Sequence, residues 1–269
     1  MRKFTWPALA GLCFLLSVAF ARAEPGLATF SREEALAYSQ AAIGKTLAGV
    51  TLVDADGRQV SLEDFRGKPL VISLIFTSCH HICPSTTQHL QQVVSKARDA
   101  LDEDSFQVIS VGFDTANDSP ERMRQFGENN GVTDPRWQFL AGDAAAVESL
   151  VNQLGFIYTP SSRGFDHLIQ SSIIDADGKV YRQVYGITFP TPQLIEPLKE
   201  LVFGEPREQS ALSHLGNRIR LFCTVYDPAT DNYYIDISVF IGTIVGVITS
   251  LVFGRILIKE WRKSIRADR

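Results

Sequence analysis

The sequence contains few cysteines and no surplus of positive charge. Its 269 residues include four cysteines, and the formal net charge is −4. The isoelectric point is about 5.8. A chain without a basic surplus gives no sign of binding nucleic acid, so we expect no nucleic-acid partner. The composition is otherwise ordinary for a globular protein.

The apolar run near the N-terminus is too short to cross a membrane. It covers residues 8–20, whereas a membrane-spanning helix needs about 20 apolar residues. Arg2 and Lys3 precede this run, and an Ala-Arg-Ala motif follows it at positions 21–23. Such an order of charge, apolar core and small residues is typical of a secretory signal. We therefore predict a cleaved signal peptide over residues 1–23.

A second apolar segment, Ile237 to Ile258, is long enough to span a bilayer. Residues 259–269 follow it and carry five basic and two acidic side chains. The positive-inside rule places such a tail in the cytoplasm. We predict a C-terminal transmembrane helix over residues 236–258 in the bacterial inner membrane. The soluble domain then lies in the periplasm, and residues 259–269 form a cytoplasmic tail.

Three cysteines remain after export, because Cys13 lies within the predicted signal peptide. These are Cys79, Cys83 and Cys223. An odd number of thiols in an oxidising compartment leaves at least one of them unpaired within the chain, or makes it a metal ligand.

Two acidic turns lack the rest of a calcium-binding loop. Residues 54–57 and 175–178 both read Asp-Ala-Asp-Gly. Neither continues to the glutamate that occupies the twelfth position of such a loop. We interpret them as tight turns, each joining two short strands.

Strands and helices alternate between these two hairpins. Before the first hairpin, a capping pattern that begins at Ser31 predicts a helix to about Ile43. After the last predicted helix, residues 205–235 are expected to form an irregular extension. The alternation favours an α/β fold with a mixed sheet. The predicted strands are 50–53, 59–62, 70–76, 106–113, 137–140, 171–174 and 180–185, and the predicted helices end near 101, 130, 154 and 203.

Two thiols lie where a predicted buried strand gives way to a helix, in Cys79-His80-His81-Ile82-Cys83-Pro84. Positions i and i+4 of a helix share a face, so both sulfurs can point at one atom. That atom is either the other sulfur, in a disulfide, or a soft metal ion. The positive potential of a helix N-terminus lowers a thiol pKa, which suits both alternatives.

A third soft ligand is available in His167, which comes just before a predicted strand. The C-x-x-x-C spacing also differs from the C-x-x-C of common dithiol oxidoreductases. Two thiolates and one imidazole suit Cu(I) and keep Cu(II) acceptable, while zinc accepts the same ligands but usually takes four. A structural disulfide between Cys79 and Cys83, with His167 merely hydrogen-bonded, stays open.

The other histidines and the third cysteine have plainer explanations. On a helix, His80 and His81 point away from the face that the two cysteines share. We expect His89 and His214 to be surface residues. Cys223 is interpreted either as a half-buried thiol or as an additional redox or copper-handling residue.

These motifs resemble the Sco/SenC family, whose members are copper-binding, thioredoxin-fold proteins that help assemble cytochrome oxidase. The resemblance covers about Gly49 to Phe203. It depends on residues 62–69, on Phe76-Thr77-Ser78-Cys79 through Cys83-Pro84, on residues 111–120 with their D-x-x-x-D-x-P pattern, and on Asp166-His167.

The resemblance implies a thioredoxin-like mixed sheet flanked by helices over residues 49–204. A helical segment, 24–48, precedes this domain, and the extension 205–235 follows it. The resemblance also implies that Cys79, Cys83 and His167 are the copper ligands.

Three acidic residues are expected near this site. Asp114 and Asp118 would support it or contact a partner, or else cap the loop and helix around them. Asp166 is the neighbour that would orient the imidazole of His167.

The chain departs from the family pattern in three places. His80-His81-Ile82 stands where many members have Pro-Asp-Val, which leaves the ligands intact but alters redox behaviour or partner choice. The anchor is C-terminal, whereas many relatives have an N-terminal one. The extension with Cys223 exceeds the minimal domain and points to a subgroup with a different client oxidase.

The resemblance implies a copper chaperone that serves the copper-containing subunit of a respiratory oxidase, with other copper chaperones as further partners. The alternative is an enzyme, a thiol–disulfide oxidoreductase that reduces cysteines of the oxidase subunit. A membrane-spanning sensor is less favoured, because a tail of residues 259–269 is too short for a signalling domain.

Overall fold

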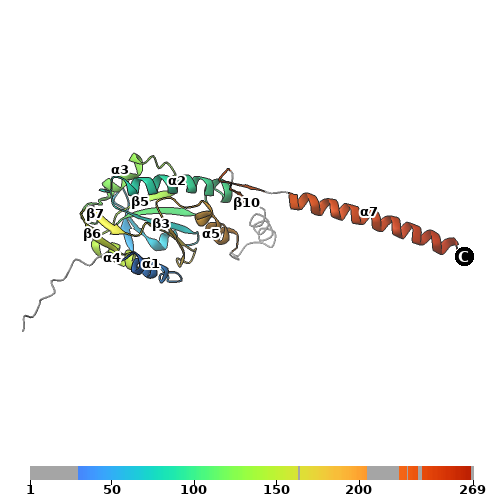
Figure 1. Cartoon of the computed structure of the whole chain (residues 1–269), viewed down its shortest axis with the longest axis horizontal. Coiled ribbons are helices and arrows are strands. Elements are labelled where there is room, and N and C mark those ends of the chain that lie inside the picture. Colours follow the sequence, from blue (N-terminus) through green and yellow to red (C-terminus); the bar gives the residue numbers. More distant parts are fainter. Residues whose placement is uncertain (1–29, 163, 205–223, 229, 236–237, 268–269) are drawn as a thin grey trace, which may run out of the picture.

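The structure is a computed structural model, and Figure 1 shows the whole chain. The predicted signal peptide, Cys223 and His214 lie outside the residues that it describes. Those residues are 30–162, 164–204, 224–228, 230–235 and 238–267.

A five-stranded mixed sheet forms the centre of the domain, with the order β5-β4-β3-β8-β9. The first three of these strands run parallel, and β8 and β9 are each antiparallel to their neighbour. All six residues of β3 are buried, as expected for a strand with neighbours on both edges and helices on both faces. The strands are β3 (Leu70–Ile75), β4 (Gln107–Gly112), β5 (Trp137–Leu140), β8 (Gln170–Ile174) and β9 (Val180–Tyr185).

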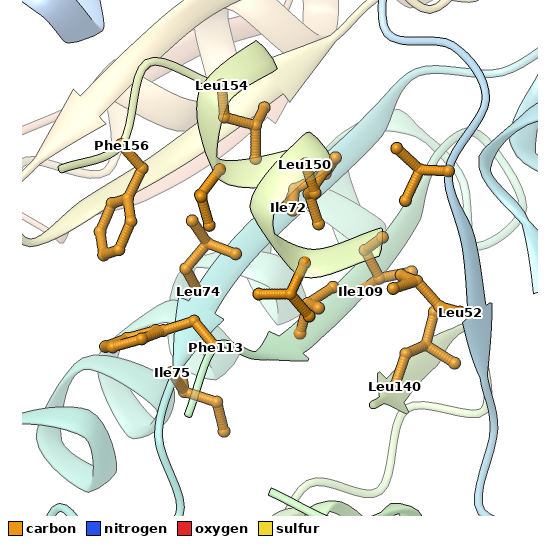
Figure 2. Packing of buried hydrophobic residues seen from close by; sticks show 14 of the residues in the cluster. Leu52, Ile72, Leu74, Ile75, Ile109, Phe113, Leu140, Leu150, Leu154 and Phe156 are labelled. Carbon is orange, nitrogen blue, oxygen red and sulfur yellow. The ribbon is translucent and has the colours of Figure 1, made fainter. Parts of the chain in front are cut away.

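Helices cover both faces of this sheet (Figure 1). Successive residues of a strand point to opposite faces, and accordingly Val71 and Ile72 belong to different apolar clusters. Val71 packs with buried residues of two helices, α2 and α5, while Ile72 lies with Leu150 of α4 (Figure 2). The helices are α1 (Arg32–Gln40), α2 (Ile82–Leu101), α3 (Pro120–Asn129), α4 (Ala144–Gln153) and α5 (Pro192–Phe203).

The predicted fold class is confirmed, and most predicted elements are present. Both acidic turns join the strands expected of them, since β1 (Thr51–Val53) pairs with β2 (Gln59–Ser61) and β8 pairs with β9. A short 3-10 helix, η1 (Leu62–Phe65), follows β2. Ser31 caps α1 as predicted, although that helix ends at Gln40 rather than near residue 43.

Two further hairpins were not predicted. One pairs β6 (Tyr158–Ser161) with β7 (Gly164–His167). The other pairs β10 (Thr224–Asp227) with β11 (Asn232–Ile235), in the extension expected to be irregular.

Side chains fasten this second hairpin to the domain. The ammonium of Lys96 on α2 lies 2.5 Å from a carboxylate oxygen of Asp231, and the hydroxyl of Tyr233 donates to Glu196 on α5 at 2.8 Å. The β10–β11 hairpin is therefore docked on α2 and α5, at the end of the domain from which the last helix departs (Figure 1).

The last helix, α7 (Ser238–Ala267), is long and apolar enough to cross a membrane. The span Ile241–Lys259 has a mean hydropathy of 2.1, and none of it is buried against the rest of the protein. The helix continues through most of the segment 259–269, which was expected to be a separate tail.

A buried hydrogen bond between β4 and β5 provides a test of this fold. The indole N–H of Trp137 donates to the hydroxyl oxygen of Ser110 at 2.9 Å. Replacing Trp137→Phe leaves a buried hydroxyl without this partner, so the free energy of unfolding should fall by about 1–3 kcal/mol in urea denaturation. The double variant Trp137→Phe/Ser110→Ala buries no unpaired polar group and should recover part of that loss. A double variant whose loss equals the sum of the two single losses would contradict the prediction.

Candidate functional site

The two thiols of the predicted site, Cys79 and Cys83, meet between the carboxyl end of β3 and the start of α2. Cys79 lies in the connecting loop and is half-buried, while Cys83 lies in the first turn of α2 and is 3% exposed. The expectation that both lie on one helix face is wrong for Cys79, because α2 begins only at Ile82. The loop nevertheless brings the sulfur of Cys79 within 3.3 Å of the amide nitrogen of Cys83, which donates to it.

This contact follows from how α2 begins. The first amide groups of a helix have no partner within the helix, and the side chain of the residue at the N-cap position, His81, makes no capping hydrogen bond. The sulfur of Cys79 accepts one of these free N–H groups instead. The chain thus uses a functional side chain as part of its helix cap.

The two thiols differ strongly in acidity. A hydrogen bond from the thiol of Cys83 and backbone N–H groups of the first turn lower the pKa of Cys79 to about 5, against the opposing effect of burial. The same hydrogen bond, together with burial, raises the pKa of Cys83. Near neutral pH, Cys79 is therefore a thiolate and Cys83 a thiol, and the two form no disulfide in the structure.

His167 is the last residue of β7, so the unpredicted β6–β7 hairpin carries the third predicted ligand. Its Nδ1 lies 2.7 Å from the carbonyl oxygen of Leu168. A carbonyl only accepts, so Nδ1 carries the proton and Nε2 keeps a lone pair for a metal. Burial lowers the pKa of His167, which keeps the ring neutral. The expected orienting role of Asp166 is wrong, because the carbonyl of Leu168 fills it and the side chain of Asp166 is exposed.

Aromatic rings surround the imidazole of His167. Its ring centroid lies 5.3 Å from that of Phe156, 5.4 Å from that of Phe113 and 6.2 Å from that of Phe76. Phe76 and Phe113 directly follow β3 and β4, so the carboxyl ends of two central strands hold the ring. The charge of the Cys79 thiolate opposes, without reversing, the lowering of the His167 pKa by burial.

Within the part of the chain that the structure describes, no three side chains of histidine, cysteine, aspartate or glutamate are gathered in a metal-holding group. The structure brings Cys79 and Cys83 into contact and places His167 nearby. A site formed by all three residues stays a prediction.

Asp118 is a buried carboxylate that fixes the loop in front of Cys79. Its Oδ1 accepts the backbone N–H of Thr77 at 2.8 Å and the Thr77 hydroxyl at 2.7 Å, while Oδ2 accepts the N–H of Asp114 at 2.9 Å. Burial raises the pKa of Asp118. Asp118 caps the loop, as the alternative expectation had it, but it does not cap the helix, because Ser119 caps α3. No room is left for a side chain at Gly112, where a Cβ would lie 2.5 Å from the Cβ of Asp118.

The remaining histidines near α2 divide into two kinds. His80 and His81 are exposed and precede α2, so the helix argument for their orientation does not apply to them. His89 is not a plain surface residue as predicted, because it is half-buried and its Nε2 lies 2.9 Å from the backbone oxygen and 3.1 Å from the backbone nitrogen of Phe189. Its ring also packs edge-on against Phe189, so His89 joins α2 to the loop before α5.

Comparison with known proteins agrees with this architecture. The family model for SCO1/SenC matches residues 42–202. The chain belongs to the SCO1/SenC family. The matched region contains the cysteine pair, His167 and the five-stranded sheet, and it ends before the β10–β11 hairpin and α7.

Two curated relatives show how far the SCO1/SenC similarity extends. The chain is 28% identical over 154 residues to the SCO1 protein homolog of Bacillus subtilis, which covers 55% of this chain and 79% of that protein. It is 27% identical over 174 residues to the mitochondrial SCO2 homolog of Mus musculus, covering 62% of this chain and 65% of that protein.

Solved structures place the fold within the same family. A structure of BsSco has 26% identity and a TM-score of 0.54, covering 60% of this chain and 96% of that one. It is described as a member of the Sco family of cytochrome c oxidase assembly proteins with a disulfide switch. A putative electron transfer protein from Aquifex aeolicus, 24% identical, has a TM-score of 0.56 and covers 62% of this chain and 97% of its own. The thioredoxin-like fold of the SCO1/SenC chain is thus confirmed.

The acidity of Cys79 gives a pH-dependent prediction. Because its folded pKa is about 5 rather than 9.0, the rate of alkylation at Cys79 should rise with pH through about 5 and be flat near neutrality. Mass spectrometry identifies the modified residue. Cys83→Ala removes the thiol donor and should move the inflection to higher pH, whereas Cys83→Ser keeps a donor and should move it less. A wild-type rate that still rises through about pH 8.5, as for a free thiol, would contradict this assignment.

The hydrogen bonds of Asp118 predict a selective stability effect. Asp118→Asn replaces one acceptor with a donor, so one of the three N–H or O–H groups around it loses its partner. The free energy of unfolding should fall by about 1–3 kcal/mol. Asp114→Asn is the matched control, because among the described residues the side chain of Asp114 accepts a hydrogen bond only from the exposed Asn117. Its effect should stay within about 0.5 kcal/mol. Urea denaturation that shows equal losses for the two variants would refute a special role for Asp118.

Proposed function

We propose that this chain is a membrane-anchored periplasmic protein that binds copper and delivers it to, or matures, the copper centre of a respiratory cytochrome oxidase. One observation carries the proposal. A thiolate and a thiol touch at the end of the central strand, close to a neutral imidazole whose Nε2 has a free lone pair.

The chemistry of these donors fits copper as the cargo. Thiolate sulfur is a soft ligand that selects Cu(I), and imidazole suits copper in either oxidation state. Zinc usually takes four protein ligands in a structural site, and the proposed set has three. Copper would be held by Cys79, Cys83 and His167.

Metal binding is coupled to protons and to the oxidation state of the two cysteines. Only thiolates bind metal well, so Cys83 must release its proton when copper is bound. A disulfide between Cys79 and Cys83 would remove both sulfur ligands. The redox state of the pair would therefore decide whether the protein holds its cargo.

The anchor and partners follow from α7 and from the family. An exposed apolar helix of this length supports attachment to a membrane, and the basic residues at its C-terminal end favour a cytoplasmic C-terminus. The proposed partners are the copper-containing subunit of a respiratory oxidase and other copper chaperones. The description of BsSco as an assembly protein of cytochrome c oxidase supports this choice.

The asymmetry of the two thiols favours a second function, thiol–disulfide exchange. Cys79 is an accessible thiolate, and Cys83 is a buried thiol beside it. That is the arrangement of an attacking and a resolving cysteine, because exchange requires a thiolate to attack a disulfide sulfur. The same pair would then reduce cysteines of the oxidase subunit before they accept metal.

The copper proposal predicts the outcome of metal analysis. Reduced full-length protein, loaded anaerobically with Cu(I), should retain a stoichiometric amount of copper. Cys79→Ala, Cys83→Ala and His167→Ala should each lower this amount, because each removes a soft donor. His89→Ala is the control, since this ring contacts a loop rather than the thiols, and it should bind as the wild type does. Full copper retention by all three ligand variants would refute the proposed site.

Oxidase maturation in cells separates the two functions. Copper delivery needs His167, whereas thiol exchange needs only the two cysteines. A His167→Ala protein that binds no copper yet supports full maturation would favour the oxidoreductase.

A further inference from the structure

A polar groove of about 340 Å³ opens directly beside Cys79. One wall consists of the thiol loop and the start of α2, with Cys79, His80 and Pro84. The other wall is α3, which lies beside the N-terminal end of α2 (Figure 1). Arg122 and Gln125 line that wall. Anything held in the groove would therefore lie against the reactive sulfur.

The groove has one guanidinium, that of Arg122, on the wall opposite the thiolate of Cys79. Arg122 is exposed, lines the groove and donates to the backbone carbonyl of Asn117 at 3.1 Å. Within the described ranges it makes no ion pair, and no acidic residue lines the groove. Arg124, two positions along the same helix, differs in this respect. It pairs with Glu121 at 2.6 Å and with Glu128 at 2.9 Å, and it does not line this groove.

The remaining lining suits an extended polypeptide. Amide side chains of Gln125, Asn129 and Asn130 offer both donors and acceptors for a peptide backbone. Pro84 on the α2 side and Phe126 on α3 add some apolar surface. A groove with amide groups, a little apolar surface and one free guanidinium fits a peptide segment that carries negative charge.

We propose that this groove binds an acidic, cysteine-bearing segment of the partner polypeptide and presents the partner's sulfur to Cys79. The inference rests on the proposed function, which requires that Cys79 meet partner thiols. It adds what that function leaves open, namely the charge of the segment and the residue that recognises it. Arg122 acts on the rate of encounter, because complementary charge steers association.

This placement of the partner's sulfur allows thiol–disulfide exchange with the two cysteines. When the partner segment holds a disulfide, the Cys79 thiolate attacks one of its sulfurs. The partner's disulfide breaks, its other sulfur leaves as a thiolate, and a mixed disulfide forms. Cys83 then loses its proton to water and attacks the sulfur of Cys79, which releases the second partner thiolate. The partner's disulfide has gained the two electrons that the Cys79–Cys83 pair has lost.

Peptides of different charge test the groove. Three short peptides carry one cysteine in mixed disulfide with thionitrobenzoate, flanked by glutamate, glutamine or lysine. Attack by Cys79 on the peptide sulfur releases coloured thionitrobenzoate, so the reaction of the reduced full chain in detergent micelles is followed by absorbance. Mass spectrometry of a Cys83→Ser variant, in which no second thiol resolves the mixed disulfide, checks that Cys79 forms the adduct. The acidic peptide should react about tenfold faster than the basic one at low salt, and the difference should shrink at high salt.

Two arginine variants separate the groove from the overall charge. Arg122→Glu should reverse the order of the acidic and basic peptides. Arg124→Glu makes the same change in net charge on the same helix but outside the groove, and it should preserve the order. Circular dichroism checks that both variants are folded.

The possible outcomes distinguish a failure of this inference from a failure of the proposed function on which it rests. Equal rates for the three wild-type peptides, or equal effects of the two arginine variants, would overturn the groove as a charge-selective site. A chain that binds copper but reacts with all peptides alike would overturn the groove alone. A chain that binds no copper and reacts with no peptide would refute the proposed function.

Discussion

The carboxylate of Asp118 is the contact on which the geometry of the thiol loop depends. It links the segments that follow two neighbouring parallel strands, Thr77 after β3 and Asp114 after β4, through three hydrogen bonds. A buried carboxylate is costly unless it is fully hydrogen-bonded, so these segments are held tightly. The loop that begins at Thr77 delivers Cys79 to the start of α2. The position of the reactive sulfur is therefore set by a residue 39 positions later in the chain.

The acidity of Cys79 depends in turn on the start of α2. The thiol of Cys83 and the amide N–H groups at the helix start both stabilise the thiolate of Cys79, so the position of this helix contributes to its acidity. The aromatic rings after β3 and β4 hold His167 at the same strand ends. Sheet, helix and hairpin thus meet at one edge, the carboxyl ends of the central strands, which is where open α/β sheets usually bind their ligands.

Elements with a strong local pattern could be predicted from the sequence. The buried run 70–76, the capping residue Ser31 and both Asp-Ala-Asp-Gly turns carry their own signals, and the structure has the strand, cap and turns they indicate. The β6–β7 hairpin has none, because Pro160 lies in its first strand and its aromatic side chains are ordered by distant partners. Likewise, no sequence spacing indicates that Leu168, rather than Asp166, orients His167, since the carbonyl groups of the backbone leave no trace in a motif.

The burial of Cys83 also determines how the protein would be damaged. Oxidation of a cysteine to sulfenic, sulfinic and sulfonic acids begins at a thiolate sulfur that reagents can reach, and its later stages are irreversible. Cys79 is both ionised and accessible, while Cys83 is protonated and 3% exposed. Peroxide would therefore consume the first sulfur and spare the second. Formation of the disulfide would then act as a shield, because it places Cys79 in a form that a thiol can restore.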